Sequence, residues 1–169
     1  MPGDPSYTRE VAVESLLLTV DHLELERAHF AGWSAGGEGL LDFGIAHPGR
    51  LISMCPVEPA ADWILAAVGE SDREHQQSND FLYSLAGQDV TEDDLAPFLH
   101  LAGFVSDPVQ ARSDPYWERA WPHRMTLSWL SEKLMGSDQS PADLAAVSCP
   151  VLLTKGTKTG KVEKGSLTC

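Results

Sequence analysis

The chain has 169 residues, of which 43% are hydrophobic, and this is enough to bury the core of one soluble domain. Twelve basic and 25 acidic residues give a net charge of −13, which disfavours nucleic acid and anionic membrane surfaces as partners. The sequence shows neither an apolar run long enough for a membrane helix nor the start of a signal peptide, so we expect no membrane association and a cytoplasmic location.

The first element that the sequence predicts is an amphipathic helix. Thr8 has the type of side chain that caps a helix N-terminus. The apolar face of this helix is formed, at helical spacing, by Val13, Leu16, Leu17, Val20 and Leu23. After the helix, a short apolar strand is predicted at residues 28–31.

A Gly-x-Ser-x-Gly motif, Gly32 to Gly36, follows this strand and precedes a helix predicted over residues 38–46. Strand, motif and helix in this order are typical of a nucleophile elbow, in which Gly32 and Gly36 permit tight packing and the Ser34 hydroxyl projects from the sheet. The backbone N–H of Ala35 would then face a developing oxyanion. The alternative is a glycine-rich turn whose serine only caps the helix.

The residues after the motif predict an α/β fold. His47-Pro48-Gly49 ends the helix, and residues 51–57 form a nearly continuous apolar strand, as is typical of a parallel strand covered on both faces. Residues 59–146 read as helical and polar-rich, with no alternating strand pattern. This middle part holds four of the five tryptophans, which are Trp63, Trp117, Trp121 and Trp129.

Three segments together resemble the α/β-hydrolase family in its esterase, lipase and lactonase-like branch: Val20 to Gly37, Ala46 to Leu51, and Cys149 to Gly156. The resemblance implies a partial sheet of about three parallel strands with an inserted helical cap. It places the first part of the core at residues 1–58, the cap at 59–146, and the last strand with a disordered tail at 147–169. The cap would line an apolar pocket for the substrate.

The resemblance also implies an activity. Ser34 would attack the carbon of an ester or related acyl bond in a small-molecule substrate, and the Ala35 N–H would supply half of an oxyanion hole, with no cofactor. A catalytically inactive fragment or interaction module that retains the elbow by descent is the alternative. The cysteines, Cys55, Cys149 and Cys169, form no CxxC pair, so we expect reduced thiols and no metal site.

Parts of the family pattern are not found, and the resemblance implies a chain truncated at both ends. Only 31 residues precede Gly32, so the early strands and the second oxyanion donor are missing. No histidine follows residue 149, and Glu58 is a weak alternative acid that can also be read as a charge or cap at a helix N-terminus. The six histidines are interpreted as structural or surface residues: His22, His29, His47, His75, His100 and His123.

Two further expectations concern the strand edges and the tail. The elbow strand would pair on one side only, which predicts self-association through exposed sheet edges or dependence on another chain. Four of the five lysines lie in the last 15 residues. We interpret this segment as a disordered terminus, with a basic tail for an acidic partner as the other interpretation.

Overall fold

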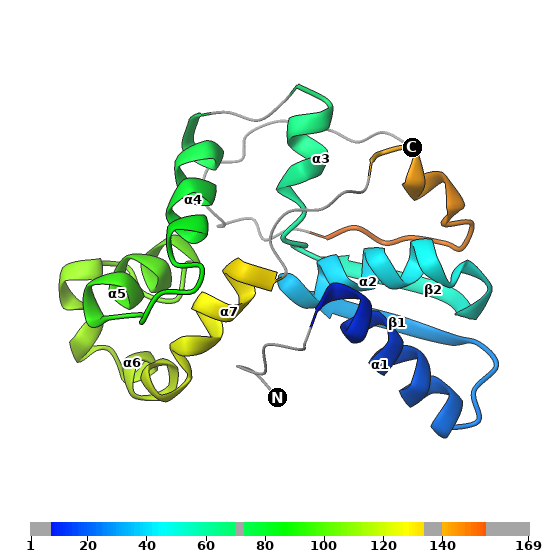
Figure 1. Cartoon of the computed structure of the whole chain (residues 1–169), viewed down its shortest axis with the longest axis horizontal. Helices are drawn as coiled ribbons and strands as arrows, with labels where there is room; N and C mark the ends of the chain where they lie inside the picture. The colour runs from blue at the N-terminus through cyan, green and yellow to red at the C-terminus, as the bar shows by residue number, and fades with distance from the viewer. Residues whose placement is uncertain (1–7, 70–72, 134–139, 155–169) are drawn as a thin grey trace.

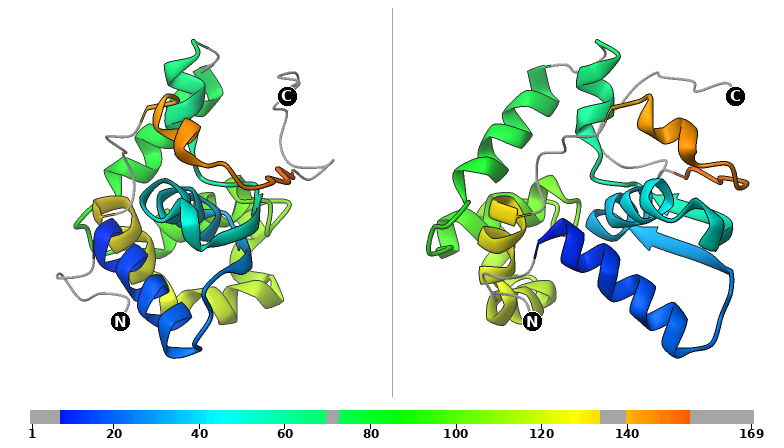
Figure 2. Two further views of the ribbon diagram at one scale, coloured as in Figure 1. Left: turned by 90° about the vertical axis from the view of Figure 1, so that its right-hand side faces the viewer. Right: turned by 45° about the vertical axis from the view of Figure 1, so that its right-hand side comes forward.

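The computed structural model describes residues 8–69, 73–133 and 140–154 of the chain. Figure 1 shows a small parallel sheet with helices packed on and beside it, and Figure 2 gives two further views. The predicted lysine-rich tail lies outside the described residues. In chain order the elements are α1 (Arg9–His22), β1 (Ala28–Trp33), α2 (Ala35–Ala46), η1 (Pro48–Arg50), β2 (Leu51–Val57), α3 (Asp62–Ala67), α4 (Arg73–Ser84), α5 (Glu92–Leu101), η2 (Pro108–Ser113), α6 (Pro115–Ala120), η3 (Trp121–His123), α7 (Met125–Lys133) and η4 (Asp143–Ala146).

Helix α1 begins where the sequence predicts it. The Thr8 hydroxyl accepts a hydrogen bond from the Val11 N–H at 3.4 Å and thereby caps the helix. Val20 is buried, and three other members of the predicted apolar face pack against the core beside the sheet. Leu23 is wrongly predicted to be part of this face: it follows the end of the helix and is 58% exposed.

Strands β1 and β2 are parallel neighbours, with Phe30 opposite Met54 and Trp33 opposite Val57. One face of the sheet packs on α2, where the rings of Phe30 and Phe43 lie 5.2 Å apart. On the other face Trp33 is exposed and Val57 is half-buried. The prediction that β2 is covered on both faces holds in part: Met54 and Pro56 are buried on the α2 side, whereas Ser53, Cys55 and Val57 on the other side are half-buried.

The segment at residues 150–154 adds to the sheet as a parallel neighbour of β2. The Met54 N–H donates to the Pro150 carbonyl at 3.0 Å, and the Leu152 N–H donates to the Met54 carbonyl at 2.9 Å. Isolated bridges join Met54 to Val151 and Val57 to Thr154. The predicted third strand is thus present as a bridged segment. Among the described residues β1 pairs with β2 alone, and self-association through its open edge stays a prediction.

All the described elements between residues 62 and 133 are helical, as predicted, and α4 to α7 gather at one end of the sheet in Figure 1.

The buried hydrophobic side chains form two clusters. The sheet cluster comprises Leu40, Leu41, Phe43, Leu51, Met54 and Ala61. The helical cluster comprises Leu85, Val90, Leu95, Ala96, Leu99, Val105, Ala111, Trp117 and Leu127.

A close contact between the end of β1 and the first turn of α2 requires glycine. A Cβ atom added at Gly32 would lie 2.2 Å from the Gly36 carbonyl oxygen, which leaves no room for a side chain. A Cβ at Gly37 would lie 3.0 Å from the Gly32 oxygen and 3.1 Å from Pro59. A Cβ at Gly36 would meet nothing within 4 Å, so the predicted need for space at Gly36 is wrong and falls on Gly37 instead.

We expect Gly32→Ala to destabilise the fold by about 3 kcal/mol or more, because the new methyl group meets backbone that cannot rotate away. Gly39→Ala is the matched control, since a Cβ there meets nothing within 4 Å and alanine favours the interior of α2. This control should stabilise the protein by about 0.5–1 kcal/mol. Urea unfolding of both variants measures the difference, and equal effects would contradict the proposed contact.

Candidate functional site

The backbone of Ser34 has a conformation that serine rarely adopts. Its φ is 53° and its ψ is −122°, and the residue is exposed between the end of β1 and the start of α2. A non-glycine residue in this region carries a strain of about 1–3 kcal/mol, which the surroundings must impose. The Ser34 side chain makes no capping hydrogen bond to α2. The interpretation of Ser34 as a simple helix cap is therefore wrong.

Backbone hydrogen bonds hold this strained residue from both sides. The Ser34 N–H donates to the Val57 carbonyl at 3.0 Å, at the end of the neighbouring strand. The Ser34 carbonyl accepts from Gly37 at 2.9 Å, from Glu38 at 3.1 Å and from Ala60 at 3.2 Å. The strand β2, the loop after it and α2 thus fix the main chain of residues 32–37, which we call the Ser34 turn. Ser34 as a whole is exposed.

Ala35 is the first residue of α2, a helix of 12 residues. Its N–H is one of the amides at a helix N-terminus that have no partner within the helix, and no backbone hydrogen bond from it occurs among the described residues. The helix dipole makes this end favourable for negative charge. An oxyanion formed next to Ser34 would meet such a donor.

Glu58 lies in the loop that follows β2. It is half-buried, has a φ of 44°, and donates its N–H to the Thr154 carbonyl at 2.9 Å. Because α3 begins at Asp62, Glu58 is not the N-cap of that helix. The same loop contributes the Ala60 N–H to the carbonyl of Ser34. Glu58 is thus carried close to the Ser34 turn by the backbone, and its role as an acid stays a prediction.

The described histidines have contacts away from Ser34. His29 lies 2.7 Å from the Ser53 hydroxyl through Nδ1, and His100 Nδ1 lies 3.2 Å from the Val105 carbonyl. The His47 ring packs at 5.3 Å from Phe43. Within residues 8–69, 73–133 and 140–154, no hydrogen bond joins a histidine to Ser34. The remaining ones are His22 and His123, both exposed, and His75, whose side chain lies outside the described part.

A cavity of about 270 Å³ lies beside the Ser34 turn, between α1, α2 and Trp129 of α7. It reaches Ala35 and Gly36 at the start of α2. Its lining also includes a charged group that the sequence analysis missed, formed by Arg9, Glu38 and Asp42. The available sequence signal was the pair of acidic residues four apart on an otherwise apolar helix, a spacing that places both on one side of α2.

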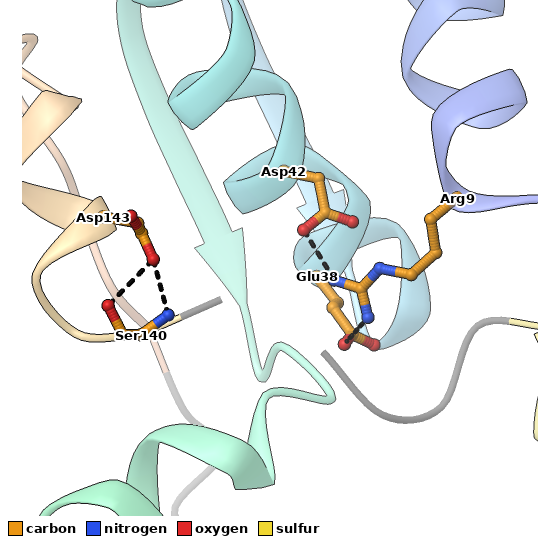
Figure 3. A network of polar contacts seen from close by, with 5 residues as sticks. All are labelled: Arg9, Glu38, Asp42, Ser140 and Asp143. Atoms are coloured by element: carbon orange, nitrogen blue, oxygen red, sulfur yellow. Dashed lines mark hydrogen bonds and ion pairs between the residues drawn. The ribbon is translucent and has the colours of Figure 1, made fainter. Parts of the chain in front are cut away.

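Figure 3 shows the Arg9 guanidinium between the two carboxylates of α2. Arg9 Nη1 donates to Glu38 Oε1 at 2.7 Å, and Nη2 donates to Asp42 Oδ1 at 2.6 Å. The side chains are 14%, 7% and 8% exposed, respectively. Burial alone would lower the pKa of Arg9, but the hydrogen bonds and charges of Asp42 and Glu38 outweigh it and raise that pKa. The Arg9 guanidinium therefore stays charged and ties α1 to α2.

A second polar contact in Figure 3 lies in the turn that leads into η4. Asp143 accepts hydrogen bonds from the Ser140 N–H at 2.7 Å and from the Ser140 hydroxyl at 2.8 Å. These bonds, the backbone one first, lower the pKa of the exposed Asp143 carboxyl. They order the turn before η4; Leu144 of η4 and Val147, which follows it, pack against the sheet cluster. Helix α2 is thus held between α1 and η4.

No protein-family model and no curated protein matches the chain. Among solved structures it is similar to naproxen esterase from Bacillus subtilis, at 20% identity and a TM-score of 0.57, over 90% of this chain and 50% of the esterase. A meta-cleavage product hydrolase matches at 16% identity and a TM-score of 0.56, over 92% of this chain and 56% of that enzyme. Proline iminopeptidase from Mycobacterium smegmatis matches at 20% identity and a TM-score of 0.50, over 90% and 57%.

The chain has the α/β-hydrolase fold. It spans about half the length of the naproxen esterase that it matches. The resemblance inferred from the motifs is therefore confirmed at the level of the fold, and so is the α/β class with a small parallel sheet. Among the described helices of this α/β-hydrolase fold, none has the length and apolar character needed to cross a membrane.

Replacing Arg9 by methionine should destabilise the protein by about 2–4 kcal/mol, because two nearly buried carboxylates lose their counter-charge. Arg112→Met is the matched control, since Arg112 also pairs with two carboxylates, Glu92 and Asp93, but is 52% exposed. Its loss should cost about 0–1 kcal/mol. Chemical unfolding compares the two variants. A similar loss of unfolding free energy in both variants would show that the buried Arg9 ion pairs stabilise the fold no more than the exposed Arg112 pairs do.

Ser34→Gly should stabilise the fold by about 1 kcal/mol, since glycine adopts the observed backbone angles without strain but loses more entropy on folding. Ser34→Ala retains a Cβ and should leave the free energy of unfolding within about 0.5 kcal/mol of the starting protein. Both values come from thermal or urea unfolding. A destabilised Ser34→Gly variant would argue against stored strain at this residue.

Proposed function

We propose that the Ser34 turn is a nucleophile elbow and that Ser34 is the nucleophile of a serine hydrolase acting on an ester or related acyl bond. The observation that carries this proposal is the backbone of Ser34, which is strained, hydrogen-bonded on both sides, and followed directly by α2. Strain of this kind is a recurrent property of catalytic residues. The contacts described above provide no structural use for the serine hydroxyl itself.

The proposed chemistry follows from the positions of Ser34 and Ala35. The Ser34 oxygen would attack the carbonyl carbon of the substrate while a base takes the hydroxyl proton. The negative charge that develops on the carbonyl oxygen would be stabilised by the Ala35 N–H and by the dipole of α2. Collapse of this intermediate breaks the bond to the leaving oxygen, which takes up the proton from the base and departs as the alcohol; the acyl-serine that remains is hydrolysed by water in a second step.

The proposed chemistry also needs a base for the Ser34 proton and an acid that orients the base. The hydrogen bonds of the described histidines do not include Ser34. Glu58 remains the candidate for the acid, because its loop is hydrogen-bonded to the backbone of Ser34 through Ala60. The names of the similar structures, an esterase, a hydrolase and an iminopeptidase, support hydrolysis as the class of reaction.

A fluorophosphonate reporter tests whether Ser34 is activated. The intact chain should be labelled once, with the modified peptide containing Ser34, and Ser34→Ala should lose at least about 100-fold in labelling rate. Ser53→Ala is the matched control, because Ser53 is the serine with a histidine at 2.7 Å, yet it lies in mid-strand without a helix N-terminus behind it.

Mass spectrometry locates the label. Labelling that persists in Ser34→Ala but disappears in Ser53→Ala would move the nucleophile to the other serine. A folded chain that stays unlabelled would sink the hydrolase proposal and favour an inactive module that keeps the elbow.

A further inference from the structure

Three aromatic rings form a continuous set of contacts that begins at Trp33. Trp33, the residue before the proposed nucleophile, is 55% exposed although it is one of the largest apolar side chains. Its ring meets Phe104 edge-on, with centroids 5.9 Å apart and planes at 88°. Phe104 in turn stacks on Tyr116 at 4.5 Å and 9°. We call these three side chains the ring surface.

Phe104 and Tyr116 are held in place by packing, whereas Trp33 is largely exposed to solvent. Phe104 and Tyr116 are half-buried and pack against the helical cluster, so their positions do not depend on a ligand. Trp33 is held at one edge by Phe104 and stands on the less covered face of the sheet, opposite Val57. More than half of its surface stays in water. A residue that served only to join the sheet to the helices would gain more by burying the whole ring.

The ring surface begins at the residue directly before the proposed nucleophile. Trp33 and Ser34 are adjacent, so their Cα atoms are about 3.8 Å apart. A substrate group that extends from the attacked carbonyl carbon toward the less covered face of the sheet would meet the indole. The Trp33 side chain comes from the end of β1, where the strand passes into the Ser34 turn and its backbone is held by the neighbouring elements.

We infer that the ring surface binds a flat, uncharged aromatic group of the substrate, which makes Trp33 a specificity-determining residue for aryl or arylalkyl esters. Aromatic rings prefer edge-on or offset-stacked partners, and both geometries already occur among the three side chains. The net charge of −13 disfavours an anionic ligand. The assignment to a substrate rests on the proposed function, whereas the preference for an aromatic group rests on the rings themselves.

The test measures binding apart from catalysis. Isothermal titration of the full chain with naphthalene-1-acetamide and with octanamide compares an aromatic and an aliphatic neutral amide, neither of which is an ester. The aromatic amide should bind about 3- to 10-fold more tightly, as expected for one additional aromatic pair. Trp33→Leu should remove this preference, because leucine keeps an apolar side chain but lacks the ring. Octanamide therefore measures ordinary apolar affinity in each variant.

Two further variants keep the test decisive. Phe104→Leu should weaken the preference by releasing the edge of Trp33, whereas Tyr83→Leu, which removes a 46% exposed aromatic residue on α4, should leave it intact. Circular dichroism confirms that each variant is folded. Because Trp33 is mostly exposed, Trp33→Leu gives the result even where Phe104→Leu fails to fold. Equal affinity for both amides, no binding of either, or a preference unchanged in Trp33→Leu would overturn the inference.

The fluorophosphonate experiment separates this inference from the proposed function. An aromatic preference in a chain whose Ser34 is not labelled would support the ring surface as a binding site and contradict the hydrolase proposal. Labelling of Ser34 without an aromatic preference would support the hydrolase proposal and contradict binding at the ring surface. Where both hold, naphthalene-1-acetamide should slow the labelling of Ser34 more than octanamide does at the same concentration, and Trp33→Leu should remove that difference.

Discussion

The close approach of Gly32 to the first turn of α2 is the constraint on which the rest of the structure depends. With no side chain at Gly32, the carbonyl of Gly36 can lie where a Cβ atom would otherwise be. The chain must then reverse from strand to helix over Ser34 alone, and the positive φ of that residue is the result. The strain is local, but the hydrogen bonds that hold it come from β2 and from the loop after it. The conformation of the Ser34 turn thus depends on the neighbouring strand and the loop after it as well as on the turn's own residues.

Helix α2 connects this turn to the remainder of the molecule. Its apolar side packs on the sheet through Phe43, and its polar side is fixed by Arg9 from α1. A buried ion pair of this kind adds little net stability compared with an apolar contact, but it is specific in direction and position. It selects one placement of α1 against α2. The start of α2, which carries Ala35, is therefore positioned by contacts on both sides of the helix.

The features that could be predicted from the sequence are those set by neighbouring residues. The Thr8 cap and the order of strand, turn and helix around Ser34 depend on local chemistry, and both are present. Helix α2 nevertheless begins at Ala35, earlier than predicted, because the low helix propensity of Gly36 and Gly37 conceals a turn that packing stabilises.

The features that escaped prediction depend on residues far apart in the chain. Arg9 lies 29 and 33 positions from its two carboxylates, and no periodicity in the sequence pairs them. The contact of Trp33 with Phe104 likewise depends on how the helical region folds back on the sheet. The apolar run of β2 predicts burial but cannot tell whether other elements will cover both faces of the strand. The local sequence pattern was thus enough to locate Ser34, whereas the contacts around Ser34 could be identified only from the tertiary structure.

The electrostatics of α2 set a condition on the proposed chemistry. Glu38 lies in the first turns of the same helix whose N-terminus would stabilise an oxyanion, and an unpaired carboxylate there would oppose the negative charge forming beside Ala35. Asp42 adds a second negative charge one turn further on. Arg9 contacts both at 2.7 and 2.6 Å and neutralises one of the two charges. The buried arginine therefore does more than join two helices: in a working hydrolase it would protect the field of the helix N-terminus, which a neutral residue of similar volume could not do.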